Sequence, residues 1–337
     1  MARFFEVFRC QGVDELANPP AMVVGFGKTS VVALADGEGF SVKSRHAGVR
    51  VTELLDPRPL LTIRNDIHNM LMQPGVDRQV REELTPDLII SARGATRYFN
   101  VFGHGLVGPP ATAIDAKSGG KSKGRDATIR VVVVKEKTIK LAIRNLKVSD
   151  GRSGGGLVDH ATRPSVPAID VATMNIVWTP QSNITFDLVS SDPLVIDDRL
   201  EPTRNELRKA LGLRPDSVPQ IGEVIEPSKL VDVIKARNQT SAEFTIIVVG
   251  RAIDSDKGNV NGITIPAGAF AVVTDFREFN TMAHETGHYI GGHATKNGWE
   301  DQHHNTTDIR MLMRGGGAGL RIPFDFAMQC RRFPAQS

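Results

Sequence analysis

The sequence predicts two different parts, an all-β sandwich over residues 1–137 and a mixed α+β domain over residues 138–337. Between Ala21 and Lys137, short runs alternate apolar and polar residues, and turn residues follow about every eight to twelve positions. After Lys137, strand patterns alternate with helix patterns, which is typical of an α+β or α/β domain. One late helix also carries two histidines four residues apart. We therefore expect a sheet domain followed by a domain with a functional helix.

The strands of the first part are predicted from their period-2 spacing. The clearest runs are SVVALADGEGFSVKS (30–44), VRVTELL (49–55), LIISARG (88–94), RYFNVFGHG (97–105), ATAIDAK (111–117) and ATIRVVVVK (127–135). Helical periodicity is nearly absent, so no helix is expected there. The pieces SRHAGVRVTE and GPPATAIDA resemble strands and turns of bacterial immunoglobulin-like modules. The resemblance implies an Ig-like sandwich.

The second part is predicted element by element from its change of period and its turn residues. The expected order is a strand at Thr138–Val148, a loop at 149–164, a helix at Val166–Trp178 ended by Pro180, a strand at 182–189, helices at 202–212 and 226–237, a buried strand at 243–253, a strand at 261–275, and a helix at about Phe279–Ile290. Pro266 interrupts the strand at 261–275, which favours the edge of a sheet.

Composition excludes several classes of protein. The 41 basic and 38 acidic residues give a formal charge of +3, and no long basic run occurs, so a nucleic-acid partner is not expected. Cys10 and Cys330 are too few for a disulfide framework or a cysteine-based zinc cluster. No stretch reaches the roughly 18 apolar residues of a membrane span. The N-terminus does not resemble a Sec signal, so a cytoplasmic protein or one exported by another route is expected.

The glycine-rich stretch GFGKTS (25–30) has a GK[ST] core but does not predict a phosphate-binding loop. A P-loop needs another glycine at the position that Met22 occupies. The stretch also lacks the third glycine of a dinucleotide fingerprint, because Ser30 stands there. We expect no nucleotide site at this turn.

The stretch HETGH (284–288) predicts a metal site on a helix. His284 and His288 are four residues apart, so both imidazoles project from one helix face and can bind one ion. Glu285 lies beside them, within reach of a water bound to that ion. Five of the nine histidines fall between His284 and His304, a density that a purely structural helix does not explain. Gly291 is expected to end the helix in a left-handed conformation.

These residues resemble the metzincin clan of zinc endopeptidases, whose pattern is HExxHxxGxxH followed by a turn with a methionine beneath the zinc. HETGHYIG matches as far as Gly291, and MLM implies a Met-turn through Met313. The resemblance covers the chain from Thr138 onward and implies a zincin fold with Zn²⁺ held by His284, His288 and a third ligand.

The third ligand stays open at this point. The position at which the clan has its third histidine is Ala294, and His293 comes one residue too early. The segment HHNTTDIRMLM instead resembles distant members in which a longer loop delivers the ligand, and His304 with Asp308 and Met313 fits that pattern. His304 and His293 are the main candidates, with His303 or Asp301 as further alternatives.

The resemblance implies a hydrolase that cleaves peptide bonds, a zinc metalloprotease with Glu285 as the general base. Protein or peptide substrates would pair with the strand at 261–275, as in the clan. Tyr98 and Tyr289 are the two tyrosines, and neither stands where some members have a tyrosine after the Met-turn. Tyr289 is expected to be a packing residue. The alternative is a zincin-fold binding protein, in which the Ig-like module recognises a partner and catalysis is weak or absent.

Overall fold

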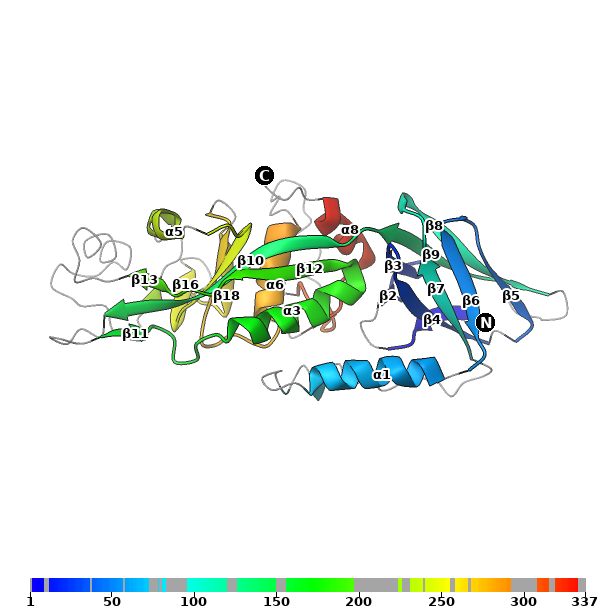
Figure 1. The fold of residues 1–337 in the computed structure, drawn as a ribbon, viewed down its shortest axis with the longest axis horizontal. Coiled ribbons are helices and arrows are strands. Elements are labelled where there is room, and N and C mark those ends of the chain that lie inside the picture. Colours follow the sequence, from blue (N-terminus) through cyan, green and yellow to red (C-terminus); the bar gives the residue numbers. More distant parts are fainter. Residues whose placement is uncertain are drawn as a thin grey trace. The chain divides into compact units, whose positions relative to one another are not determined.

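A computed structural model of the chain is mixed α+β, with mostly sheets and few helices (Figure 1). The structure describes residues 2–332 except 9–11, 37, 57, 73–77, 79–80, 83–95, 120–125, 150–155, 197–223, 226–230, 239, 255–257, 266–267, 292–307 and 315–318. The chain divides into two compact units. The first contains residues 1–137, 175–185 and 320–332, and the second contains residues 138–174, 186–319 and 333–337.

The first unit contains two sheets. One has the order β1-β4-β7-β6 and is antiparallel throughout, with strands β1 (Arg3–Glu6), β4 (Thr29–Ala35), β6 (Val49–Leu54) and β7 (Arg97–Gly103). The other has the order β2-β3-β9-β8-β5, with strands β2 (Val13–Asp14), β3 (Ala21–Gly25), β5 (Phe40–Ser44), β8 (Val107–Ser118) and β9 (Ala127–Val134). Its β3 and β9 are parallel, and its other pairs are antiparallel.

The two sheets share one hydrophobic core. Phe4, Leu34 and Val101 from the first sheet and Met22 and Ile129 from the second belong to the same buried cluster. Along each strand, alternate side chains point to opposite faces, so the period-2 spacing places one apolar set in this core. The predicted strands in this unit occur as expected where the structure describes them, and the one predicted at 88–94 lies outside the described residues.

A helix in the first unit contradicts the expectation that helices are absent there. Helix α1 runs over Arg58–Leu71 and buries Leu60 and Leu71. The Asp56 carboxylate accepts a hydrogen bond from the Arg58 backbone N–H at 2.9 Å, which caps the first turn. The sequence does carry the signal for this helix, because Leu60, Ile63, Ile67 and Leu71 recur at helical spacing, and the period-2 interpretation of the region overlooked it.

The end of helix α3 and the last helix complete the first unit. Helix α3 (Pro167–Ser182) begins in the second unit and ends in the first. It continues through Pro180, which corrects the expected end before that residue. Pro180 lies in the last turn, where the Gln181 and Ser182 side chains donate to the carbonyl oxygens of Val177 and Trp178. Asn183 then ends the helix with a φ of 53°.

Helix α8 (Phe324–Arg332) was not expected from the sequence. The Asp14 carboxylate of β2 accepts a hydrogen bond from the Phe324 N–H at 2.9 Å, at the start of the helix. Near its end, the Lys137 ammonium donates to the Cys330 carbonyl oxygen at 2.8 Å. These contacts place opposite charges at the two helix ends, each with the sign that stabilises the helix dipole.

The second unit is built on a sheet of seven strands. Its main order is β11-β10-β15-β19-β18, with strands β10 (Lys137–Ser149), β11 (Leu157–Asp159), β15 (Phe244–Val248), β18 (Gly262–Ile265) and β19 (Phe270–Val273). Strands β12 (Ile184–Ser190) and β13 (Leu194–Ile196) also pair with β10. Strand β15 is parallel to β10 and β19, whereas β18 is antiparallel to β19. Strand β18 ends this order. The single edge strand predicted at 261–275 is wrong, because these residues form the antiparallel pair β18 and β19, and β19 lies inside the sheet between β15 and β18.

Several elements of the second unit differ from the expectation. The run at 243–253 forms β15 and then β16 (Arg251–Asp254), and β16 joins a small sheet with β14 (Val224–Ile225) and β17 (Gly258–Asn259). The expected loop at 149–164 contains β11. Helix α5 (Val231–Arg237) is the described part of the helix predicted at 226–237. The helix predicted at 202–212 lies outside the described residues, as does Pro266.

Candidate metal centre

Helix α6 (Thr281–Ile290) carries His284, Glu285 and His288 and packs against β15, β18 and β19. On the side of the helix that faces the sheet, Tyr289 stacks on Phe244 with ring centroids 4.4 Å apart. The Tyr289 hydroxyl donates to the Glu243 carbonyl oxygen at 2.9 Å, and burial raises the pKa of this phenol. Tyr289 is therefore a packing residue, as the sequence predicts, and it holds the helix against the sheet.

His284 and His288 present their Nε2 atoms to one point in space. The two atoms are 3.1 Å apart, and the rings are nearly perpendicular, at 82°. Two Zn–N bonds of about 2.0–2.1 Å that meet near the tetrahedral angle would separate their nitrogens by roughly 3.3 Å. The spacing of four residues along the helix thus places the two histidines so that both can bind one ion. The ion would replace the direct contact between their Nε2 atoms.

A backbone carbonyl group orients His284. The Leu312 carbonyl oxygen lies 2.7 Å from the Nδ1 atom of His284, so the Nδ1–H tautomer is favoured and Nε2 keeps its lone pair. Leu312 and Met313 are both buried, and they lie in a turn in which the Arg314 N–H donates to the Met311 carbonyl oxygen at 3.3 Å. The segment that was expected to form a Met-turn therefore contacts the first histidine of the motif.

Glu285 is buried, with 5% of its surface exposed. Its carboxylate and the ring nitrogens of His284 and His288 offer ligand atoms that all lie within 4.8 Å of one another. Its Oε2 atom accepts a hydrogen bond from the Thr264 hydroxyl at 2.7 Å. The carboxylate is therefore close enough to contact a water molecule bound to an ion that His284 and His288 hold.

The residues that were considered for the third ligand are outside the described part of the chain. His304, His293, His303 and Asp301 all fall within 292–307. Asp308 belongs to the same sequence pattern as His304. It is described, and its carboxylate accepts hydrogen bonds from the Arg310 side chain. Gly291 takes a right-handed conformation, with a φ of −73°, so the expected left-handed end of the helix is wrong.

The donor set fits a transition-metal ion. Two neutral imidazoles and a nearby carboxylate suit Zn²⁺, and they also suit other first-row divalent ions. The described group can therefore hold a metal, and its chemistry does not single out zinc.

A polar network that the sequence did not indicate lies just before helix α6. The Asp275 carboxylate accepts hydrogen bonds from the Thr162 hydroxyl and from the backbone N–H groups of Thr162 and Arg163, at 2.7–2.8 Å. The Arg277 guanidinium donates to the carbonyl oxygens of Thr274 and Arg163. These contacts tie the turn between β19 and α6 to residues 162–163. The only signal in the sequence was a run of polar residues in an expected loop.

His160 is a buried neutral histidine beside this network. Its Nδ1 atom accepts a hydrogen bond from the Gly250 N–H at 2.9 Å, so the proton of the neutral ring is on Nε2. Burial lowers the pKa of His160 to about 4, although the negative charge of Asp275 acts in the opposite direction. The ring is therefore uncharged at neutral pH.

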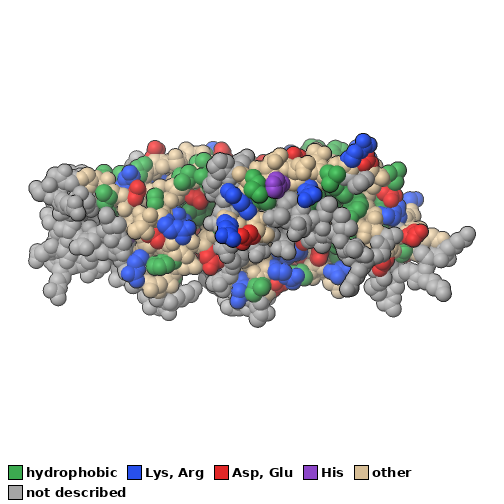
Figure 2. All heavy atoms as spheres, turned by 90° about the horizontal axis from the view of Figure 1, so that it is seen from below, with side chains coloured by type: hydrophobic (Ala, Val, Ile, Leu, Met, Phe, Trp, Pro, Cys, Tyr) green, Lys and Arg blue, Asp and Glu red, His purple; other side chains and the backbone are tan. Residues whose placement is uncertain are grey.

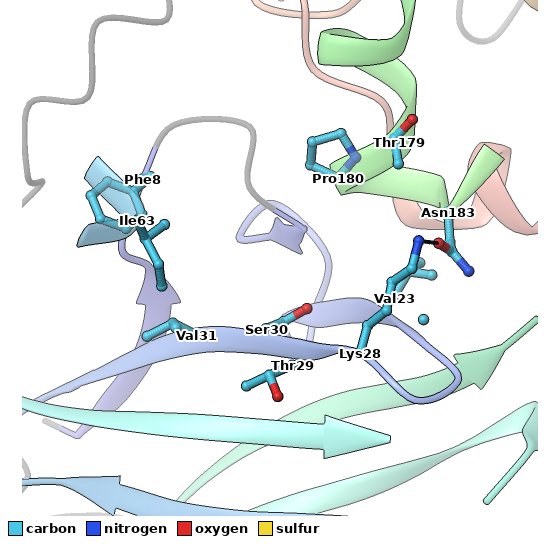
Figure 3. Close-up of a pocket in the computed structure, with 11 residues that line it drawn as sticks. Phe8, Val23, Lys28, Thr29, Ser30, Val31, Ile63, Thr179, Pro180 and Asn183 are labelled. Atoms are coloured by element: carbon cyan, nitrogen blue, oxygen red, sulfur yellow. Dashed lines mark hydrogen bonds between the residues drawn. The ribbon is translucent and has the colours of Figure 1, made fainter. Parts of the chain in front are cut away.

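The GFGKTS stretch lines a cavity of about 230 Å³ in the first unit (Figure 3). The stretch joins strand β3 to strand β4, whereas a P-loop joins a strand to a helix. The Lys28 ammonium bonds to the Glu136 carboxylate at 2.7 Å and to the Asn183 side-chain oxygen at 3.2 Å. Phe8 and Ile63 lie at the other end of the cavity in Figure 3. These contacts give Lys28 a structural role at this turn.

The described surface has mixed charge. In Figure 2, basic and acidic side chains are interspersed over the described part of the face that is shown. No helix in the described residues is both long enough and apolar enough to cross a membrane. The expectation that nucleic acid is not a partner stays a prediction.

Comparisons with known proteins give no family for the chain. No family model matches it, and no curated protein matches it. Among solved structures, it has a likeness to "Chimeric titin Z1Z2 functionalized with a KLER exogenous peptide from decorin", with 10% sequence identity and a TM-score of 0.17. The match covers 43% of this chain and 57% of that chain. A TM-score this low supports no conclusion about fold or function.

Proposed function

We propose that the chain is a zinc-dependent endopeptidase of metzincin type, with an Ig-like module in its first unit. The observation that carries the proposal is the approach of the His284 and His288 Nε2 atoms to 3.1 Å, with the Glu285 carboxylate beside them. The Leu312 carbonyl oxygen at His284 Nδ1 adds the outer contact that metal-binding histidines commonly make. A purely structural helix does not require two histidines and a glutamate in this arrangement.

The order of elements around helix α6 supports the proposal. A strand (β10), a helix (α3), a strand (β12), a buried strand (β15) and an edge strand (β18) follow one another in the order that the resemblance to metzincins implies. The order departs from the resemblance in one place, since the interior strand β19 lies between β18 and α6. The Met313 turn follows α6 and contacts it through Leu312. This agreement comes from segments far apart in the sequence, so it is independent of the HETGH motif.

The chain's own residues have distinct roles in this proposal. His284 and His288, with a third ligand from residues 292–307, would hold Zn²⁺. The bound ion would polarise a substrate carbonyl group and lower the pKa of a water molecule to about 7. Glu285 would accept the proton of that water and donate it to the leaving amine. His284 and His288 must stay neutral to act as ligands, and the Leu312 carbonyl group favours the neutral tautomer that is required of His284.

A peptide is the proposed substrate because of strand β18. This strand pairs with β19 on one side and ends the described strand order of its sheet. Its other edge can accept an extended peptide by strand addition. A substrate bound there would lie beside β18 in the plane of the sheet, next to the strand from which Gly262 and Thr264 approach helix α6.

The experiment compares purified wild-type protein with the Glu285→Ala variant. We expect the wild type to contain zinc and to hydrolyse casein, and we expect 1,10-phenanthroline to abolish hydrolysis until zinc is restored. Glu285→Ala should keep zinc and lose at least roughly 100-fold in kcat, because Glu285 is a base rather than a ligand.

Glu278→Ala is the matched control, since Glu278 precedes helix α6 and is not one of the grouped residues that could hold a metal. Undiminished hydrolysis by Glu285→Ala would refute the mechanism. A wild type that binds zinc but cleaves no protein would favour a zincin-fold binding protein instead.

A further inference from the structure

Two residues of strand β18 contact the Glu285 side chain. The Thr264 hydroxyl lies 2.7 Å from Glu285 Oε2 and 2.8 Å from the Glu285 carbonyl oxygen. A methyl group on Gly262 would lie 2.7 Å from Glu285 Oε1 and 2.9 Å from its Cγ atom. Thr264 thus binds one oxygen of the carboxylate, and Gly262 leaves the space in which the other oxygen lies. We call this pair of residues the Glu285 seat.

The alternation of strand β18 creates the seat. Gly262 and Thr264 are two residues apart, so they face the same side of the sheet, toward helix α6. Ile263 and Ile265 face the other side, where they pack against a buried apolar cluster that includes Phe270 and Val272. The packing of the two isoleucines holds strand β18 in the sheet. It therefore also fixes the position of Gly262 and Thr264 against helix α6.

Glu285 depends on this seat because it is buried. Thr264 and Glu285 are 6% and 5% exposed, so water replaces a lost partner poorly. The Thr264 hydroxyl has one proton, and a carboxylate is a stronger acceptor than a helix carbonyl group that has its own N–H partner. The proton therefore goes to Oε2. Gly262 supplies the space for Oε1, because any side chain there would overlap it.

We propose that Gly262 and Thr264 are positioning residues that set the place of the Glu285 carboxylate beside the His284 and His288 pair. This inference rests on the proposed function, because it assigns the base of that reaction to a fixed seat. The seat belongs to the same strand that would bind the substrate. One strand therefore sets the position of both the base and the peptide, and a small shift of either would separate the reacting atoms.

The kinetic test uses Thr264→Val, which keeps the shape of the side chain and removes the hydroxyl. We expect kcat for peptide hydrolysis to fall roughly 10- to 100-fold, with KM changed by less than about twofold and with zinc content unchanged. Thr264→Ser should restore most of kcat, since it returns the donor. Gly262→Ala should lower kcat by a similar factor through displacement of Oε1.

Thr286→Val is the matched control for this series. Thr286 is also a buried threonine, but its hydroxyl donates to the Met282 carbonyl oxygen of the same helix at 2.8 Å. The variant makes the same chemical change one residue from Glu285 and leaves the seat intact. We expect its kcat to stay within about twofold of the wild type.

A second readout needs neither activity nor metal. In chelator-treated protein, Thr264→Val should lower the midpoint of thermal unfolding in the wild-type background and should have a clearly smaller effect in the Glu285→Ala background. This difference measures the contact between the two side chains. The difference between the two backgrounds can still be measured if Thr264→Val lowers the stability of the protein. Thr264→Ser and Gly262→Ala are milder variants for the same comparison.

The outcomes separate the two proposals. If the wild type and Thr264→Val have equal kcat while Glu285→Ala is inactive, the proposed function stands and the positioning role is refuted. Equal effects of Thr264→Val in both backgrounds would also refute the seat. If the wild type cleaves no peptide although the unfolding midpoints show the contact, the proposed function fails, and the catalytic role of the seat fails with it.

Discussion

At the scale of single residues, the candidate centre depends on side chains that are each oriented by a partner outside the HETGH motif. The Leu312 carbonyl group orients His284, Thr264 donates a hydrogen bond to the Glu285 carboxylate, and Gly262 leaves room for it. Such outer contacts commonly change metal affinity or activity by about 10- to 100-fold when they are lost. The motif alone therefore identifies the candidate residues, while its partners determine their geometry.

The third ligand is a prediction at this scale. We expect His304→Ala to remove zinc from the purified protein, because the loss of one ligand should weaken binding by several kcal/mol, at least roughly 100-fold. His293→Ala should retain zinc and activity. Metal analysis after dialysis would measure both. Zinc loss in His293→Ala, with full metal content in His304→Ala, would instead show that a shorter loop after Gly291 delivers the ligand.

His160 predicts a pH dependence of stability. Its folded pKa of about 4 is below the ordinary value of 6.5, so the unfolded chain binds the proton first as the pH falls. The folded state therefore keeps a contribution of roughly 3 kcal/mol above about pH 6.5 and loses it between pH 6.5 and 4.

His160→Asn tests this dependence, because its amide oxygen can take the place of Nδ1 and accept the Gly250 N–H. We expect denaturant unfolding to show a smaller loss of stability for the variant than for the wild type between pH 7 and 4.5. Parallel pH profiles for the two proteins would mean that His160 does not titrate in this way.

At the scale of elements, helix α6 is held by its neighbours more than by its own ends. Its N-cap residue, Asn280, makes no side-chain capping bond and instead donates to the Gly319 carbonyl oxygen at 2.8 Å. Strands β15, β18 and β19 cover one face of the helix, and the Asp275 and Arg277 contacts fix the turn before it. Packing of this kind supplies most of the stability of a short helix in a protein.

Asp14 caps the start of helix α8, and this contact can be tested by mutation. Asp14 accepts a hydrogen bond from the Phe324 N–H and also from the N–H groups of Leu16 and Ala17. Asp14→Ala should therefore lower the free energy of unfolding by about 1–2 kcal/mol, as expected for the loss of a helix cap. Glu38→Ala removes an exposed carboxylate from the same unit and serves as the control. Equal unfolding midpoints for the two variants in urea would contradict the capping role.

At the scale of the whole molecule, the first unit is assembled from distant parts of the chain. Residues 175–185 and 320–332 join residues 1–137 in it. The Arg321 guanidinium and the Glu6 carboxylate form an ion pair at 2.5 Å, with side chains that are 9% and 3% exposed. Gln181 also bonds to Leu320 and Ile322. The first unit is thus completed only when the end of the chain returns to it.

Three changes test this assembly. Arg321→Ala leaves a buried carboxylate without its charged partner and should lower the free energy of unfolding of the first unit by about 3–5 kcal/mol. A fragment of residues 1–137 should be less stable than the same residues in the full chain, which hydrogen exchange would measure. The double variant Glu6→Gln, Arg321→Met should recover part of the loss. A fragment as protected as the full chain would show that the later segments contribute little.

The sequence by itself determined the features that depend on local spacing. Period-2 runs predicted most described strands of the first unit, and four-residue spacing predicted the pairing of His284 with His288. Pro266 predicted an edge strand, and β18 has that position, but the sequence did not indicate that residues 261–275 form two paired strands with β19 inside the sheet. Local geometry is sufficient in these cases, because the residues that interact are neighbours on one strand or one helix turn.

Only the tertiary structure decided the features that depend on distant residues. The end of helix α3 past Pro180 is held by Gln181, which bonds to Leu320 and Ile322, and α8 begins where Asp14 of a remote strand caps it. No periodicity in the sequence encodes that Thr264 faces Glu285 or that Arg321 meets Glu6. These pairs are 21 and 315 residues apart, so their contact follows from how the sheets bring separate segments together. The physical reason is that burial and hydrogen bonding select partners in space, whereas a sequence pattern records only neighbours along the chain.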